Sequence, residues 1–128
     1  MKSLVTGGAG FIGSNLVDYL VKKGHKVVIL DNFSTGRRSN LSHHKKTNVK
    51  IIKVDISVKK KLEKYFKGID YVFHLAGLAD IVPSIENPDK YFKANVIGTF
   101  NVVQAAKKAK VKKFVYAASA SCYGISNK

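Results

Sequence analysis

The sequence is short of cysteine, of acidic residues and of long hydrophobic runs. Its single cysteine, Cys122, excludes an intramolecular disulfide. No window holds the roughly 18 consecutive apolar residues that a membrane-spanning helix needs, and residues 1–7 are too briefly apolar for a signal peptide. The 128 residues are 45% hydrophobic and 24% charged, which is ordinary for one globular domain. We therefore expect a single cytoplasmic domain over residues 1–128, with no membrane contact.

The scarcity of acidic residues leaves a strong positive charge. Eight Asp and Glu residues stand against 23 Lys and Arg residues, and the net charge is +15. Such a balance is typical of proteins that bind nucleic acid or another polyanion, but a lysine-rich proteome or a basic portion of a more neutral protein would also produce it. The lysine clusters lie at predicted helix ends and polar faces, and no aromatic residues are interleaved with them in a base-stacking pattern. We therefore predict solvated faces and no specific nucleic-acid binding.

Short β-branched runs alternate with amphipathic helical patterns. Apolar runs predict strands at residues 2–6, 26–30, 49–54, 70–75 and 114–118. Apolar residues at helical spacing predict helices at residues 11–23, 57–66 and 87–110, with loops at 32–48 and 76–87. Alternation of this kind favours parallel strands joined by helical crossovers. The expected fold is α/β, a Rossmann-type doubly wound parallel sheet of five strands in the order 3-2-1-4-5.

Local signals predict the ends and the packed face of the helices. Gly24 is a C-cap for the first helix, Ser57 an N-cap for the second, and Asn87-Pro88 a helix start for the third. In the first helix one face gathers apolar residues at helical spacing and is predicted to pack on the sheet, namely Ile12, Leu16, Tyr19 and Leu20.

Residues 7–13, Gly-Gly-Ala-Gly-Phe-Ile-Gly, come directly after the first predicted strand and open the first helix. In such a turn Gly7 permits the sharp bend, Gly10 lets the backbone approach a pyrophosphate, and Gly13 lets the helix pack closely. The helix N-terminus attracts phosphate groups. Asp31 ends the second strand, where a carboxylate can accept hydrogen bonds from both ribose hydroxyls. The combination predicts a dinucleotide site, the alternative being a glycine-rich turn in a non-nucleotide α/β protein.

Asp31 also bears on the type of dinucleotide. A carboxylate beside the ribose repels a 2′-phosphate, so the sequence favours NAD over NADP. Arg37 and Arg38 follow closely and offer the alternative, since arginine can accept a 2′-phosphate.

Six ordered blocks resemble one known family over the whole chain. They are TGGAGFIGSNL (6–16), GHKVVILDNFSTGRRSNL (24–41), VDI (54–56), HLAGLADIVPSIENP (74–88), NVIGTFNVVQAA (95–106) and FVYAASASCYG (114–124). The chain resembles the extended short-chain dehydrogenase/reductases, and within them the NAD-dependent nucleotide-sugar epimerases and dehydratases. HLAGL is most similar to the motif of the UDP-glucose/UDP-N-acetylglucosamine 4-epimerases.

The resemblance implies a set of cofactor contacts. Gly7, Gly10, Gly13 and the backbone of Phe11 and Ile12 would hold the pyrophosphate. The adenosine ribose would be wrapped by Asp31, Asn32, Ser34, Thr35 and Gly36, with Asp55 and Ile56 at the adenine. The nicotinamide side would be lined by Leu75, Ala76, Gly77, Leu78 and Ala79, and Asn95 would hold the backbone near the cofactor. Ser119 would be catalytic and hydrogen-bond the reacting sugar oxygen.

The chain departs from the family pattern at several positions. Ala79 stands where some 4-epimerases have lysine, Ala118 where serine is usual, and Cys122 where valine is common. The family's general base is a tyrosine with a lysine four residues later, which lowers the tyrosine pKa. This pair lies beyond the Tyr123-Gly124 position, and its only match here is Tyr19 with Lys23, which we interpret as chance.

These patterns together predict the NAD-binding portion of a nucleotide-sugar 4-epimerase, acting on a UDP-sugar. The C-terminal substrate lobe is absent from the 128 residues, so the chain alone is expected to be inactive, and the full-length enzyme to be a homodimer. The alternatives are part of a 4,6-dehydratase or decarboxylase, or a non-catalytic NAD-binding module or half of a split enzyme.

The histidines and the cysteine receive structural interpretations. His74 ends the fourth predicted strand, where a structural role is favoured over catalysis. His43 and His44 have no cysteine or acid at ligand spacing in the sequence, so no metal site is predicted. Cys122 is interpreted as a structural thiol.

Overall fold

The computed structural model describes residues 1–44, 47–59, 62–119 and 123–124. Its strands are β1 (Lys2–Thr6), β2 (Lys26–Asp31), β3 (Val49–Lys53), β4 (Tyr71–His74) and β5 (Lys113–Tyr116). Its α-helices are α1 (Phe11–Lys22), α2 (Glu63–Phe66), α3 (Ile81–Glu86), α4 (Pro88–Tyr91) and α5 (Gly98–Lys108). A 3₁₀ turn covers Arg38–Leu41 and a π-helical turn covers Phe92–Ile97.

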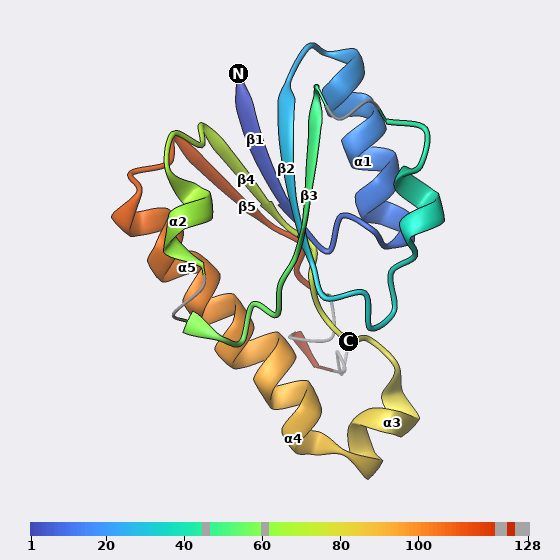
Figure 1. Cartoon of the computed structure of the whole chain (residues 1–128). Coiled ribbons are helices and arrows are strands. Elements are labelled where there is room, and N and C mark those ends of the chain that lie inside the picture. The colour runs from blue at the N-terminus through green and yellow to red at the C-terminus, as the bar shows by residue number, and fades with distance from the viewer. Residues whose placement is uncertain (45–46, 60–61, 120–122, 125–128) are drawn as a thin grey trace.

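The five strands form one parallel sheet in the order β3-β2-β1-β4-β5 (Figure 1). This confirms the predicted Rossmann-type order. From β1 the chain first builds outward through β2 and β3, and then returns to add β4 and β5 on the other side of β1. In the register, Thr6 pairs with both Leu30 and His74. The carboxyl ends of β1, β2 and β4 therefore meet where the strand order reverses, the position at which open α/β sheets bind ligands.

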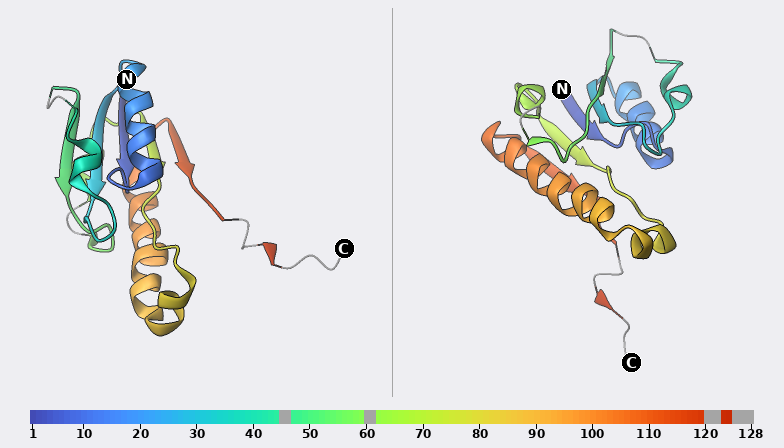
Figure 2. Two further views of the ribbon diagram at one scale, coloured as in Figure 1. Left: turned by 90° about the vertical axis from the view of Figure 1, so that its right-hand side faces the viewer. Right: turned by 60° about the horizontal axis from the view of Figure 1, so that its bottom comes forward.

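Helices cover both faces of the sheet, with α1 on one face and α2 and α5 on the other (Figures 1 and 2). Alternate residues of each strand point to opposite faces. Leu4 and Val72 therefore pack with Phe66 of α2 and with α5. Their neighbours on the other face, such as Val5 and Ile29, pack with α1. Burial on both faces explains why the strands are apolar along their length.

The packed face of α1 differs from the predicted one. Its buried residues are Gly13, Ser14, Val17 and Leu20, whereas Ile12 is 69% exposed and Tyr19 is 57% exposed. The prediction was therefore wrong for Ile12 and Tyr19. The helix turns Gly13 toward the sheet at its first turn, and this choice fixes Val17 and Leu20 as the next buried positions at helical spacing. Tyr19 is left at the surface, where the Nζ atom of Lys23 lies 5.6 Å from its ring.

The second predicted helix also needs correction, whereas the third is confirmed as a continuous helical run that starts at Pro88 and is capped by the side chain of Asn87. The second is reduced to α2, which begins at Glu63, so Ser57 lies too far from its start to cap it. The N–H of Ser57 donates to Oδ1 of Asp55 in a local turn (2.8 Å). The third comprises α4, the π-helical turn and α5 in succession. Helix α3 lies inside the predicted loop 76–87. It buries none of its residues, and its apolar side chains, Ile81, Val82 and Ile85, are all exposed.

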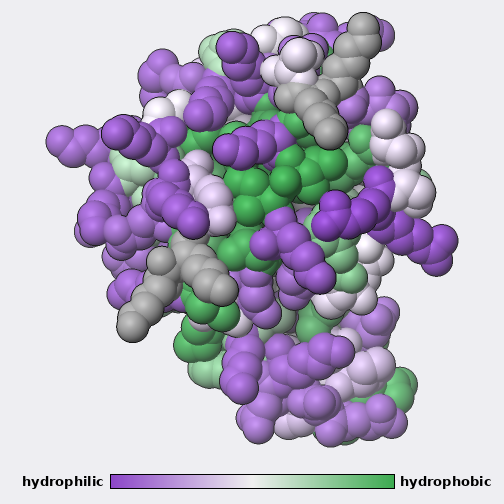
Figure 3. Space-filling model, in the orientation of Figure 1, coloured by the Kyte–Doolittle hydropathy of each residue, from purple (hydrophilic) through white to green (hydrophobic). Residues whose placement is uncertain are grey.

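Hydrophobic residues gather in the middle of the face seen in Figure 1, and hydrophilic residues surround them (Figure 3). Within the part of the chain that the structure describes, no helix has the length and apolar character needed to cross a bilayer.

Candidate functional site

The glycine-rich turn after β1 has two glycines that the fold itself requires. Gly7 has a φ of +69°, and a Cβ built there would lie 2.8 Å from the Cα of Ala76. A Cβ on Gly13 would lie 2.2 Å from the carbonyl oxygen of Gly7. The structure thus shows the sharp bend at Gly7 and the close helix packing at Gly13 that the spacing predicts.

Gly10 is required for a different reason. Its nearest neighbour would lie 3.3 Å from an added Cβ, so the protein itself nearly has room for a methyl group. Gly10 lines an open cavity at the start of α1, and the space that a Cβ would fill belongs to that cavity. The first N–H groups of α1 have no carbonyl partner within the helix. The turn is therefore a cradle that suits a phosphate group.

Asp31 ends β2 and joins the two loops that border this cradle. It is 7% exposed. Its Oδ2 accepts the N–H of Ala9 (2.9 Å) and its Oδ1 accepts the N–H of Phe33 (2.8 Å). Each carboxylate oxygen can accept a second hydrogen bond. Asp31 lines the cavity, so its remaining acceptor positions are available to a pair of hydroxyl groups there.

The two arginines do not reach this place. The guanidinium of Arg38 lies 4.4 Å from the centre of the Phe33 ring, and the N–H of Arg37 donates to the carbonyl of Ala9. Neither residue lines the cavity. Among the two sequence alternatives, the geometry therefore favours an unphosphorylated ribose beside Asp31.

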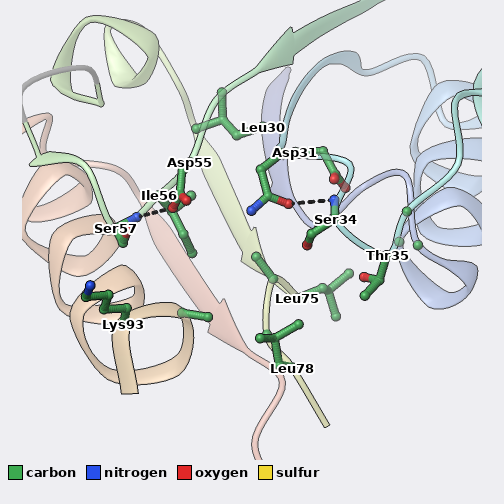
Figure 4. A pocket seen from close by; sticks show the side chains of 18 of the residues that line it. Leu30, Asp31, Ser34, Thr35, Asp55, Ile56, Ser57, Leu75, Leu78 and Lys93 are labelled. Atoms are coloured by element: carbon green, nitrogen blue, oxygen red, sulfur yellow. Dashed lines mark hydrogen bonds between the residues drawn. The ribbon is translucent and has the colours of Figure 1, made fainter. Parts of the chain in front are cut away.

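The cavity measures about 760 Å³ and opens at the carboxyl ends of the strands, which is within the usual range for small-molecule sites. Figure 4 shows its two sides, Asp31, Ser34 and Thr35 on one and Asp55, Ser57 and Lys93 on the other, with Leu75 and Leu78 between them. The predicted contacts that line it are Gly7, Gly10, Phe11, Ile12, Gly13, Asp31, Asn32, Ser34, Thr35, Gly36, Asp55, Ile56, Leu75, Ala76, Gly77 and Leu78.

Of the predicted cofactor contacts, Ala79 and Asn95 do not line the cavity. Asn95 supports the cavity wall through two hydrogen bonds to the backbone of a lining residue, Leu78. Its Oδ1 accepts the N–H of Leu78 (2.8 Å) and its Nδ2 donates to the carbonyl of the same residue (2.9 Å). The amide thus satisfies a stretch of backbone that belongs to no helix or strand, and holds Leu78 in the wall.

Asn101 holds the opposite wall in the same way. It is 5% exposed, and its Nδ2 donates to the carbonyls of Ile56 (3.1 Å) and Ser57 (2.9 Å). Asn95 itself lies in the π-helical turn Phe92–Ile97, where the helix widens before α5 and Asn101. Turns of this kind are rare and concentrate at functional sites. Here the widened turn contributes Lys93 and Ala94 to the cavity.

His74 connects three elements beneath the site. Its Nδ1 lies 2.6 Å from Oγ1 of Thr6 in β1, and its Nε2 lies 2.8 Å from Oγ1 of Thr99 in α5. It is 1% exposed, and burial lowers its pKa from 6.5 to about 4. The Thr6 hydroxyl also accepts the N–H groups of Leu75 and Ala76 (both 3.2 Å). His74 is thus a neutral structural residue that supports the cavity wall.

Ser119 lies two residues beyond Ala117, which lines the cavity, and is itself exposed and outside the lining. Tyr123 is 88% exposed. Cys122 lies outside the described residues.

Residues 3–128 match the NAD dependent epimerase/dehydratase family. The chain belongs to this family. The matched residues include all six blocks on which the resemblance rested.

This epimerase/dehydratase chain is 40% identical over 123 residues to the UDP-N-acetyl-alpha-D-glucosaminuronate decarboxylase of Bacillus cytotoxicus, covering 96% of this chain and 38% of that protein. Its structure is similar to UDP-N-acetylglucosamine 4-epimerase from Methanobrevibacter ruminantium M1, in complex with UDP-N-acetylmuramic acid (TM-score 0.91, 39% identity, 99% of this chain, 40% of that chain). It is also similar to the UDP-glucose 4-epimerase of Thermus thermophilus, in complex with NAD (TM-score 0.83, 38% identity, 93% of this chain, 38% of that chain).

The epimerase/dehydratase chain therefore spans about two fifths of the length of each of these relatives. The part it spans contains the cavity described above.

Sequence reasoning missed part of the cavity lining. The missed residues are Leu30, Val54, Ser57, Asn87, Asp89, Lys90, Lys93, Ala94 and Ala117. Leu30, Val54 and Ala117 lie at or just beyond strand ends, so the rule that ligands bind at the carboxyl edge could have found them. No local signal places the lining residues between Asn87 and Ala94, because they reach the cavity only through the packing of α4 and the π-helical turn.

Proposed function

We propose that this chain is the NAD-binding part of a nucleotide-sugar 4-epimerase that acts on a UDP-sugar. The observation that carries the proposal is the position of Asp31, at the end of β2 and beside the glycine cradle, in a cavity at the point where the strand order reverses. An acid and a phosphate cradle placed in this way suit an adenosine ribose linked to a pyrophosphate.

The residues of the cavity fit such a cofactor. Asp31 accepts the two ribose hydroxyls, and its charge repels a 2′-phosphate, so NAD is bound in preference to NADP. The first turn of α1, at Phe11 and Ile12, receives the pyrophosphate. Asp55 and Ile56 border the adenine, on the side of the cavity that Asn101 holds.

When bound, NAD supplies a hydride acceptor and donor for transient oxidation of the sugar at C4. The chain's own residues orient and protect that reaction. Leu75 and Leu78 form an apolar wall that keeps water away, and Asn95 fixes this wall by both of its amide atoms. Ser119 hydrogen-bonds the C4 hydroxyl of the sugar.

Among the residues that the structure describes, no tyrosine lines the cavity to act as the general base. The one Tyr-x-x-x-Lys of the sequence places Tyr19 on the exposed surface of α1. We therefore infer that the 128-residue chain alone does not epimerise a UDP-sugar, and that the working enzyme, as a homodimer, includes further chain. Turnover of UDP-glucose or UDP-N-acetylglucosamine by the pure chain would contradict this inference.

Cofactor preference tests the proposal directly. The dissociation constants of NAD and NADP are measured by calorimetry for the chain and for Asp31→Ser. We expect the chain to bind NAD at least about tenfold more tightly than NADP, and Asp31→Ser to lose most of that ratio, because the repelling charge is gone. The ratio is insensitive to a loss of folded protein. The matched control is Asp80→Ser, at an exposed carboxylate outside the cavity lining, which should keep the ratio.

A UDP-sugar decarboxylase is the second candidate, because the Bacillus cytotoxicus relative with that activity is 40% identical to this chain. A non-catalytic NAD-binding module, or half of a split enzyme, is the third. The mass of the native protein, detected with an antibody to residues 1–128, distinguishes an enzyme from a binding module. A mass well above that of 128 residues supports the enzyme, whose products from UDP-glucose and UDP-glucuronate then distinguish epimerase from decarboxylase. A mass equal to that of the chain favours the module.

A further inference from the structure

A cluster of three metal-ligand side chains lies outside the nucleotide cavity. Asp18 comes from the middle of α1, while His43 and His44 follow the 3₁₀ turn. Their ligand atoms all lie within 4.8 Å of one another. Asp18 is 25 residues from His43 in the sequence, so the residues around the two histidines do not reveal it as a ligand. The packing of the 3₁₀ turn against α1 brings the three side chains together.

The two imidazoles converge on one oxygen. The Nε2 of His43 lies 2.8 Å from Oδ1 of Asp18, and the Nε2 of His44 lies 2.7 Å from the same atom. The ring centres are 4.2 Å apart and the rings are tilted by 39°. Two ring nitrogens that both lie close to a single carboxylate oxygen bring three ligand atoms together at one place.

His44 supplies the independent observation that points to a ligand. Its side chain is only 7% exposed. Its Nε2 is buried and, among the described residues, forms no hydrogen bond, since its approach to Asp18 lacks the required geometry. A buried polar atom of this kind is costly unless something satisfies it. A cation held between the three side chains would do so.

We propose that Asp18, His43 and His44 form a binding site for a divalent transition-metal ion of the Zn²⁺ class. Two imidazoles and one carboxylate are a donor set that Zn²⁺ accepts, with water in the remaining position. The exposed sides of Asp18 and His43, whose side chains are 47% and 57% exposed, leave room for that water.

The distances require only a small opening of the cluster. With metal–ligand bonds of about 2.1 Å, tetrahedral ligand atoms lie about 3.4 Å apart. The two nitrogen–oxygen separations must therefore widen by roughly 0.6 Å. Rotation of the exposed Asp18 side chain provides this movement without displacing the buried His44 ring.

The segment that carries the histidines is already fixed to the fold. Leu41 is 1% exposed, and the side chain of Asn40 donates to the carbonyl of Ala9 (2.9 Å). Little ordering is therefore needed when the metal binds. The same segment begins at Asp31 and includes Ser34 to Gly36 of the nucleotide cavity. A metal ion at its far end would tie this whole loop to α1 and stabilise the folded chain.

Calorimetric titration with ZnCl₂ tests the site on the 128-residue chain, produced without a histidine tag and freed of metal. We expect one Zn²⁺ per chain and a thermal midpoint that rises with Zn²⁺. Asp18→Asn and His44→Gln should each weaken binding at least about tenfold. The matched controls, Asp80→Asn and His25→Gln, should bind Zn²⁺ like the parent chain.

Cobalt gives a second measurement that does not depend on stability. Co²⁺ bound by the parent chain should show visible absorption bands, and Asp18→Asn, an isosteric change at an exposed position, should lose them. Absence of stoichiometric binding by the parent chain, or equal binding by Asp18→Asn and His44→Gln, would overturn the proposal and leave a carboxylate–imidazole ion pair in its place.

Discussion

His74 shows how a single buried residue can govern the response of the fold to acid. Both ring nitrogens are at hydrogen-bond distance from threonine hydroxyls of other elements, and burial lowers the pKa of the ring from 6.5 to about 4. The folded chain therefore resists protonation of His74 over a range in which the unfolded chain takes up the proton. The Thr6 hydroxyl accepts the N–H groups of Leu75 and Ala76 and therefore donates its own proton to Nδ1, which leaves the proton of the neutral ring on Nε2, facing Thr99.

We expect the free energy of unfolding to be fully maintained above pH 6.5 and to fall as the pH decreases from 6.5 to 4. The loss from His74 should be on the order of 3 kcal/mol. Urea unfolding at several pH values measures it, and His74→Gln should flatten the decline in this window while lowering stability overall. Asp70, whose pKa the hydrogen bond from Lys112 lowers below 3.8, acts only at more acid pH. An equal decline in His74→Gln would show that another group is responsible.

Residue types that act locally were predictable, and those that act through packing were not. Gly7, Gly13 and Asp31 sit at fixed offsets from a strand, so their spacing in the sequence was enough to place them. Asp18 and His44 are brought together only by the docking of the 3₁₀ turn on α1, and no local rule contains that contact.

At the scale of elements, the run from α4 through α5 organises both sides of the cavity. Asn95 and Asn101 lie on this one run, and each holds the backbone of a different wall, at Leu78 and at Ile56 with Ser57. These walls follow β4 and β3, where the chain forms neither helix nor strand. Asparagine suits this role because one side chain offers both a donor and an acceptor to such backbone.

Asn95→Leu tests the contribution of this clamp. The change removes the hydrogen-bond partner of both the N–H and the carbonyl of Leu78. Each of these groups, where it stays buried, then costs about 1–3 kcal/mol of folding free energy. We expect NAD affinity to fall by about tenfold or more, because the wall beside the cofactor loosens. Calorimetry with NAD provides the measurement, at a temperature where the variant remains folded by circular dichroism.

Asn48→Leu is the matched control for Asn95→Leu. Asn48 is exposed and precedes β3, at the edge of the sheet opposite the cavity. Its replacement should leave NAD affinity unchanged. If Asn95→Leu bound NAD as tightly as the control, Asn95 would be ruled out as a support of the binding wall.

The order of elements was easier to predict than their extent. Parallel pairing follows from strands alternating with helices, and the predicted sheet order is confirmed. Helix α3 and the exposure of Tyr19 were not predicted. Both depend on which surfaces are left exposed once the other elements have packed together. The face of α1 was decided by Gly13, which must lie against the backbone of Gly7, rather than by the more hydrophobic Ile12.

At the scale of the whole molecule, the net charge of +15 has no counterpart in the cavity. The ionisable residues that line it carry both signs, namely Asp31, Asp55, Asp89, Lys90 and Lys93. Of the lysines that the structure describes, all but Lys2 are exposed, and Lys108 and Lys112 are paired with Glu63 and Asp70. The charge is thus a property of the surface and separate from the nucleotide site.

The surface charge therefore predicts binding to polyanions that is weak, nonspecific and sensitive to salt. We expect the chain to be retained on immobilised duplex DNA at low ionic strength and released by about 0.2–0.3 M NaCl, because each phosphate contact releases a counterion. NAD affinity should change far less over the same range, since a few short-range contacts at the cradle and Asp31 provide it. Column elution and calorimetry at matched salt make the comparison. Retention at about 0.5 M NaCl, or a preference for one DNA sequence, would instead indicate a dedicated nucleic-acid surface.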